Sequence, residues 1–140
     1  MTARELAEAY LGALARADLT AMLSLFSAGA VVHSPLYGPV PACEFFPALF
    51  GDTAESRLTL RGVTKGTAAD GTPLVSIWFH FDWQLPGGQR VPFDVVDVLE
   101  LDHGGHIAAL RIVYDTADIR PIFEQETGRH SWRAEQPANQ

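Results

Sequence analysis

The chain has 140 residues, of which 47% are hydrophobic and 19% are charged, the proportions of one soluble globular domain. Its net charge of −7 and its lack of a lysine and arginine cluster argue against nucleic acid or an anionic membrane as a partner. No apolar run is long enough to cross a bilayer, the N-terminus lacks the order of a signal peptide, and Cys43 has no second cysteine to pair with, so we expect a cytoplasmic location. These properties leave the choice among small-molecule ligands open.

The first predicted element is a helix that begins with a capping box formed by Thr2 and Glu5 and runs to about Ala17. Leucines recur on both sides of Tyr10 at intervals of four residues. Tyr10 therefore lies on the apolar stripe of this helix and is expected to face the core.

Short elements are predicted between this helix and residue 51. Asp18 is a suitable N-cap for a second helix, which Gly29 ends. A short strand follows over residues 30–34. The segment 36–41 is rich in proline and glycine and is expected to be irregular, and a third helix covers about 42–50.

Alternation with a period of two begins near residue 57 and predicts four long strands joined by turn sequences. These strands are expected over residues 58–67, 74–84, 91–101 and 107–114. A single closing turn is expected at 118–123. Residues 1–123 then form one domain, and the polar tail at 124–140 is expected to be loose.

Helices followed by hairpin-connected strands predict an α+β fold, in which a curved antiparallel sheet of four to five strands wraps around three N-terminal helices. Such a cone would leave an internal pocket, and aromatic residues on the inward faces suit an apolar ligand. The expected wall residues are Phe46, Phe79, Phe81, Trp83, Val95, Leu110, Ile112 and Tyr114.

The strand predicted over 91–101 carries one carboxylate on its apolar face. Alternation places Asp97 on the same side as Phe93 and Leu99. Burial of an ionised carboxylate without a partner is costly, so Asp97 is expected to be either paired or held neutral. Perturbed acids cluster at functional sites, which makes Asp97 the first candidate site residue.

Several stretches of the chain resemble those of a known family: AYLGALARADLTAMLSLFSAGAVVHSP at 9–35, EFF at 44–46, FHFDWQ at 79–84, and VVDVLEL with GGHIAALRIVY in 95–114. The family is the nuclear transport factor 2-like superfamily, and the branch most similar is that of ketosteroid isomerases and small SnoaL-like polyketide cyclases. The resemblance covers about residues 5–123. It implies a cone-shaped fold that binds a small hydrophobic ligand with no cofactor and no metal.

The resemblance also implies site residues. The oxyanion-hole donors of the isomerase fall on Tyr10 and Asp97. Its catalytic base, an aspartate just before a proline, is Ser34 here, and a serine cannot take a proton from carbon without a base of its own. His33 is adjacent, but alternation points it to the other face. Substitute bases away from the family position are Asp94, Asp82 and Glu44.

Other chemistries of the superfamily receive less support from the residues. Epoxide hydrolases of this superfamily use an arginine two positions before the strand aspartate, where Val95 stands. Dehydratase relatives use paired histidines in the pocket. His80 is expected to point out of the cone, and His103 and His106 belong to a turn.

The outer face of the strand at 74–84 carries Ser76, Trp78 and His80. A tryptophan on an otherwise solvated sheet face favours a homodimer made through these outer faces. Two functions remain open from the sequence. One is an isomerase- or cyclase-like enzyme that stabilises an enolate through Tyr10 and Asp97, and the other is a binding module that keeps the pocket without the chemistry.

Overall fold

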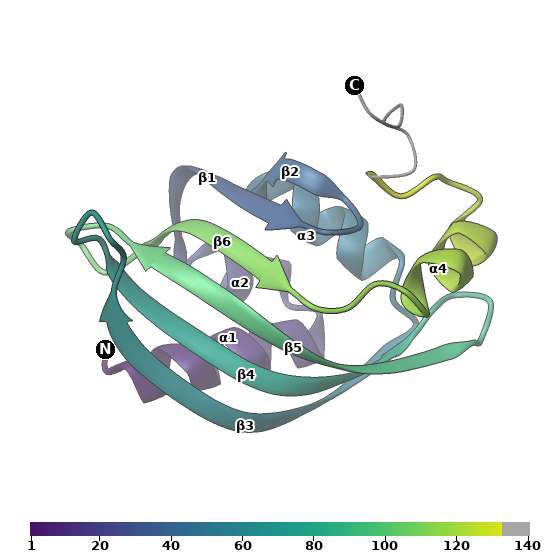
Figure 1. Cartoon of the computed structure of the whole chain (residues 1–140), viewed down its shortest axis with the longest axis horizontal. Helices are drawn as coiled ribbons and strands as arrows, with labels where there is room; N and C mark the ends of the chain where they lie inside the picture. The colour runs from purple at the N-terminus through teal and green to yellow at the C-terminus, as the bar shows by residue number, and fades with distance from the viewer. Residues whose placement is uncertain (133–140) are drawn as a thin grey trace.

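The computed structural model describes residues 1–132, which form four helices and one six-stranded sheet (Figure 1). The helices are α1 (Ala3–Arg16), α2 (Leu19–Leu23), α3 (Ala42–Gly51) and α4 (Ile119–Thr127). The strands are β1 (Phe26–Ser34), β2 (Gly38–Pro41), β3 (Glu55–Thr67), β4 (Pro73–Gln84), β5 (Arg90–Leu101) and β6 (Ile107–Val113). None of the helices in this part of the chain is long and apolar enough to span a membrane.

The strands are arranged in the order β2-β1-β6-β5-β4-β3, and only the β1–β6 pair is parallel. Figure 1 shows the long strands β3, β4 and β5 curving around one side of the molecule, with α1, α2 and α3 on one face of the sheet. This arrangement confirms the predicted α+β class. The sheet has six strands where four to five were expected.

The first difference lies between α2 and β1. The second helix was expected to end at Gly29, but α2 ends at Leu23 and the chain enters β1 at Phe26. Phe26 pairs with Ile107 of β6, and the register then shifts before Val31. Gly29, with a φ of +79°, lies inside this irregularity, so it allows a bulge in a strand rather than the end of a helix.

The second difference is strand β2, which covers most of a segment that was expected to be irregular. Its residues pair antiparallel with β1, for example Val40 with Val32. β2 is the edge strand of the sheet, where the missing N–H groups of Pro39 and Pro41 cost no ladder hydrogen bond. The prolines therefore mark an edge strand here.

The third difference lies at the C-terminal end. Helix α4 replaces the expected single turn, and hydrogen bonds join the residues that follow it to the rest of the fold. Ser131 is fully buried and its hydroxyl accepts a hydrogen bond from Arg120, which also donates to the carbonyl of Pro35 at 3.3 Å. The amide of Trp132 donates to the carbonyl of Leu36 at 2.7 Å. Residues 133–140 of the predicted tail lie outside the described residues.

The core lies between the inner face of the sheet and the helices. The expected capping box of Thr2 and Glu5 is present, and it starts α1 so that Tyr10 is only 1% exposed. Alternate residues of β4 and β5 are buried on the same side, and Asp97 is among them at 2% exposed. The fold therefore carries one carboxylate into the centre of an otherwise apolar core.

Candidate functional site

A cavity opens between the inner face of the sheet and the helices α1 and α3. About 40 Å³ of it can be occupied by the centre of a water-sized sphere. Its surface is overwhelmingly apolar, and the polar side chains Tyr10, Ser34, Tyr37, Asp97 and Tyr114 are among those that line it. This combination of an apolar wall with a few polar groups is typical of a small-molecule site.

Six of the expected wall residues line this cavity, namely Phe79, Phe81, Trp83, Val95, Ile112 and Tyr114. Two do not. Phe46 is packed behind the wall against Phe26 and Phe50, with ring centroids 5.3 and 6.0 Å away. Leu110 lies on the same face of β6 as Ile112, two residues before it, and pairs with Leu99 of β5. Its side chain is fully buried in the core.

Five further wall residues were not expected from the sequence: Leu14, Tyr37, Phe45, Leu49 and Phe93. Leu14 and Phe93 share a face with Tyr10 and Asp97, so the periodicity could have included them. The sequence could not show which of the neighbouring phenylalanines of α3 would face the cavity. Phe45 faces the cavity while Phe46, one residue on, faces the core.

Tyr10 and Asp97 meet at the centre of the site. The Tyr10 hydroxyl donates a hydrogen bond to Oδ2 of Asp97 at 2.7 Å, and both side chains are buried. Oδ1 of Asp97 is also buried, and it has no hydrogen-bond partner within the described part of the chain. Since the one hydroxyl proton of Tyr10 is directed at Asp97, the free polar atom of the pair is Oδ1.

The protonation of Asp97 is set by its burial. Removal from water raises the pKa of the Asp97 carboxyl to about 7, and the hydrogen bond from Tyr10 opposes this rise in part because it favours the charged form. Burial, together with the neighbouring carboxylate, raises the pKa of Tyr10 well above its usual value, so Tyr10 keeps its proton. Near neutral pH, Asp97 therefore exists in both its acid and its base form.

Ser34, at the position of the family base, lies in the wall and is buried. Its Oγ accepts hydrogen bonds from the backbone amides of Leu36 at 3.2 Å and Tyr37 at 3.1 Å. The residue therefore stabilises the turn between β1 and β2, and its hydroxyl proton has no acceptor among residues 1–132. The neighbouring His33 does not line the cavity, and it pairs in register with Arg111, which is exposed.

None of the substitute bases lines the cavity. Asp94 lies on the outer sheet face, where it pairs with Arg61 and with Nδ1 of His80. Asp82 faces the same way and pairs with Arg90, and Glu44 is exposed on α3. The histidines His103 and His106 belong to the turn after β5, as expected, and they do not line this cavity.

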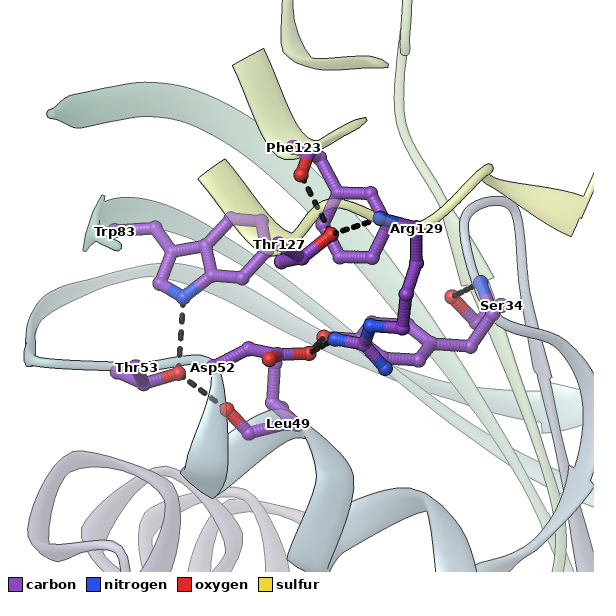
Figure 2. Close-up of polar contacts among 9 residues, drawn as sticks. Ser34, Leu49, Asp52, Thr53, Trp83, Phe123, Thr127 and Arg129 are labelled. Carbon is purple, nitrogen blue, oxygen red and sulfur yellow. Dashed lines mark hydrogen bonds and ion pairs between the residues drawn. The ribbon is translucent and has the colours of Figure 1, made fainter. Parts of the chain in front are cut away.

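Polar contacts that sequence reasoning did not foresee fix one side of the wall. The Tyr37 hydroxyl donates to Asp52 at 2.7 Å, and Asp52 also pairs with Arg129 just beyond α4. Figure 2 shows Arg129 reaching Asp52 beside the ring of Phe123. These partners are 15 and 77 residues apart in the chain, so no local pattern links them.

A second set of contacts orients the indole ring of the wall. The Trp83 Nε1–H donates to Thr53 Oγ1 at 2.9 Å, and the Thr53 hydroxyl donates to the carbonyl of Leu49 at 2.6 Å (Figure 2). Trp83 and Leu49 both line the cavity. The hydrogen bonds therefore join β4 to the end of α3 and fix the shape of the wall.

Solved structures with the same fold were found. The epoxide hydrolase/cyclase-like enzyme SalBIII, which has a role in pyran ring formation in polyether salinomycin, is 20% identical over 83% of this chain and 92% of its own, with a TM-score of 0.66. An NTF2-like protein of unknown function from Burkholderia pseudomallei is 16% identical over 88% and 98% of the two chains, with a TM-score of 0.73. A hypothetical protein with a ketosteroid isomerase-like fold from Catenulispora acidiphila, in complex with trimethylamine, is 15% identical over 91% and 95%, with a TM-score of 0.69.

These identities establish similarity of fold. A comparison with curated proteins gave no match. The family model of the SnoaL-like domain matches residues 7–110, which is most of the chain and contains both Tyr10 and Asp97. The chain therefore belongs to the family of SnoaL-like domains, within the NTF2-like superfamily.

Proposed function

We propose that the protein binds a small hydrophobic ketone, enol or phenol in this cavity and that Asp97 exchanges a proton with it. The observation that carries the proposal is the free Oδ1 of Asp97, a buried polar atom without a partner in an apolar cavity. A ligand oxygen placed there would supply the missing hydrogen bond. A carboxyl with a pKa of about 7 also suits proton transfer near neutral pH.

The geometry defines the part that each residue of the pair plays. When Asp97 is protonated, Oδ1 donates to the ligand oxygen while Oδ2 still accepts from Tyr10. When Asp97 is ionised, Oδ1 is available as a base. Tyr10 thus acts through Asp97 and positions it, whereas the family resemblance implied that both would donate to the oxyanion.

An isomerase- or cyclase-like reaction is the chemistry that this arrangement supports. Enolisation and ring closure both develop charge on an oxygen, and a donor buried beside that oxygen stabilises the transition state. The fold shared with SalBIII, the epoxide hydrolase/cyclase-like enzyme of pyran ring formation, is consistent with ring closure. One observation favours a second function, non-catalytic binding: Ser34 stands where the family base would be, and no other carboxylate of residues 1–132 lines the cavity beside Asp97.

Binding of 2-naphthol tests the function directly. We expect Asp97→Ala to weaken 2-naphthol binding roughly 10- to 100-fold because the donor to the ligand oxygen is lost. Asp97→Asn keeps a donor of the same size and should stay within about fivefold of the parent protein. Titration calorimetry measures both, with naphthalene as the control ligand without an oxygen. Equal 2-naphthol affinities in all three proteins would refute the proposed function.

The pKa of Asp97 predicts a pH dependence of stability. A folded pKa of about 7 against an ordinary value of 3.8 means that between these values the folded state binds a proton that the unfolded state lacks. Stability is therefore lost as pH rises from about 4 to about 7. Asp97→Asn removes this effect. Between pH 4.5 and pH 7.5, the free energy of unfolding in urea should therefore fall by about 3 kcal/mol more in the parent than in the variant. Parallel pH profiles for the two proteins would show that Asp97 is ionised at pH 4.5 in the fold.

Replacement of Ser34 tests whether a missing base separates this protein from a steroid isomerase. Aspartate at 34 can accept the same hydrogen bonds from the amides of Leu36 and Tyr37. These bonds would keep its carboxylate ionised and hold it in the orientation of the Ser34 side chain. We expect Ser34→Asp to raise the isomerisation rate of a β,γ-unsaturated ketosteroid about 10²-fold, the usual contribution of a positioned base. Ser34→Asn is the matched uncharged control. Equal rates in Ser34→Asp and Ser34→Asn would mean that the cavity does not place the steroid for this reaction.

We also propose a homodimer through the outer sheet face. Trp78 is 48% exposed and Val113 is 59% exposed, and both pair with Val96, which lies between them on the same face. This apolar row, flanked by Ser76 and His80, would be covered in a dimer. We expect Trp78→Lys to shift the sedimentation coefficient from dimer to monomer, whereas Ala28→Lys, at an exposed position of β1, should not. Even a weak dimer should be populated at a protein concentration of roughly 100 μM. Sedimentation of the parent protein as a monomer at that concentration would contradict the dimer.

A further inference from the structure

Tyr114 differs from the other two tyrosines of the chain in the state of its hydroxyl. The Tyr10 hydroxyl donates to Asp97 and the Tyr37 hydroxyl donates to Asp52, each at 2.7 Å. The Tyr114 hydroxyl makes no hydrogen bond with any residue in the part of the chain that the structure describes. Its ring is fixed against Phe93, with the centroids 4.6 Å apart, and lines the cavity.

The strand register places Tyr114 diagonally opposite Asp97 on the inner face of the sheet. Asp97 pairs with Ile112 across β5 and β6, and Tyr114 lies two residues after Ile112, so its side chain emerges on the same inward face. Diagonal neighbours of this kind are within reach of a long aromatic side chain. Burial and, after it, the charge of Asp97 raise the pKa of Tyr114 well above its usual value, so its hydroxyl is protonated at neutral pH and available as a donor.

Two polar atoms of one apolar cavity are thus left without partners. Of the two, Oδ1 of Asp97 is fully buried, whereas Tyr114 is partly buried. A single oxygen atom of a ligand, placed between Oδ1 of Asp97 and the hydroxyl of Tyr114, can satisfy both groups at once. Ketone, enolate and phenolate oxygens accept two such hydrogen bonds, and an oxygen that carries negative charge gains most from them.

We propose that the Tyr114 hydroxyl is the second donor to the ligand oxygen, so that the oxyanion site consists of Tyr114 and Asp97 with Tyr10 behind Asp97. The inference rests on the proposed function and adds a residue and a ligand class to it. The ligand is an aromatic or cyclic compound whose oxygen is, or becomes, an enolate or phenolate. Phe93 and the other aromatic rings of the wall would enclose its apolar part.

The ring-preserving variant Tyr114→Phe tests this role, with 2-naphthol and naphthalene as the probes. We expect 2-naphthol to bind roughly tenfold more weakly to Tyr114→Phe, while naphthalene affinity stays within about twofold, because only the hydrogen bond is lost. The control variant Phe93→Leu alters the same wall without removing a hydroxyl, so it should weaken both ligands by a similar factor and leave their ratio unchanged.

Thermal unfolding of the empty proteins provides the second measurement. A hydroxyl without a protein partner contributes nothing to the fold, so Tyr114→Phe is expected to melt at or above the temperature of the parent. A lower melting temperature, or an unchanged ratio of 2-naphthol to naphthalene affinity, would overturn the assignment of Tyr114. If that ratio falls in Asp97→Ala but not in Tyr114→Phe, the proposed function stands and this inference fails. If it falls in neither variant, both fail.

Discussion

The burial of Asp97 against Tyr10 is the constraint on which the rest of the site depends. A carboxyl that is 2% exposed must keep its proton, gain a strong partner or be expelled, and here a single hydrogen bond of 2.7 Å holds one of its oxygens. β5 is an interior strand between β4 and β6, so Asp97 cannot turn toward solvent without disrupting two ladders. The fold therefore raises the pKa of this carboxyl to about 7 and leaves Oδ1 facing the cavity.

The wall around this carboxyl is held by polar contacts that lie outside the ligand space. Asp52 holds the hydroxyl of Tyr37, and Thr53 holds the indole of Trp83, so two large rings are fixed where α3 meets the sheet. The ion pair of Asp52 with Arg129 extends the same network to the residues after α4. Fixed walls reduce the entropy lost when a ligand binds, and they also maintain the position of the few polar groups that can orient it.

Much of the fold followed from sequence patterns, because the period of two after residue 57 and the helix caps are local signals. The elements that were missed depend on contacts between distant residues. β2 exists because β1 provides a partner for a proline-rich segment, and α4 is anchored through Arg120 to the turn after β1. The stripe positions of Tyr10 and Asp97 could be read from periodicity, but the direction of the hydrogen bond between them could not. That direction changes the role of Tyr10 from a ligand donor to a residue that positions Asp97.

The identity of the donors bears on which reactions the cavity could support. One carboxyl cannot donate a hydrogen bond to a ligand oxygen and take a proton from carbon in the same step. Where Asp97 is the only polar group at the oxygen, the site stabilises an oxyanion but has no base, as the presence of Ser34 also indicates. A donor at Tyr114 keeps a hydrogen bond on the oxygen after Asp97 has given up its proton, so Asp97, with a pKa of about 7, can exchange that proton with the ligand oxygen. The absence of the family aspartate then leaves the cavity without a base for carbon, and exchange at the ligand oxygen is the proton transfer that Asp97 itself carries out.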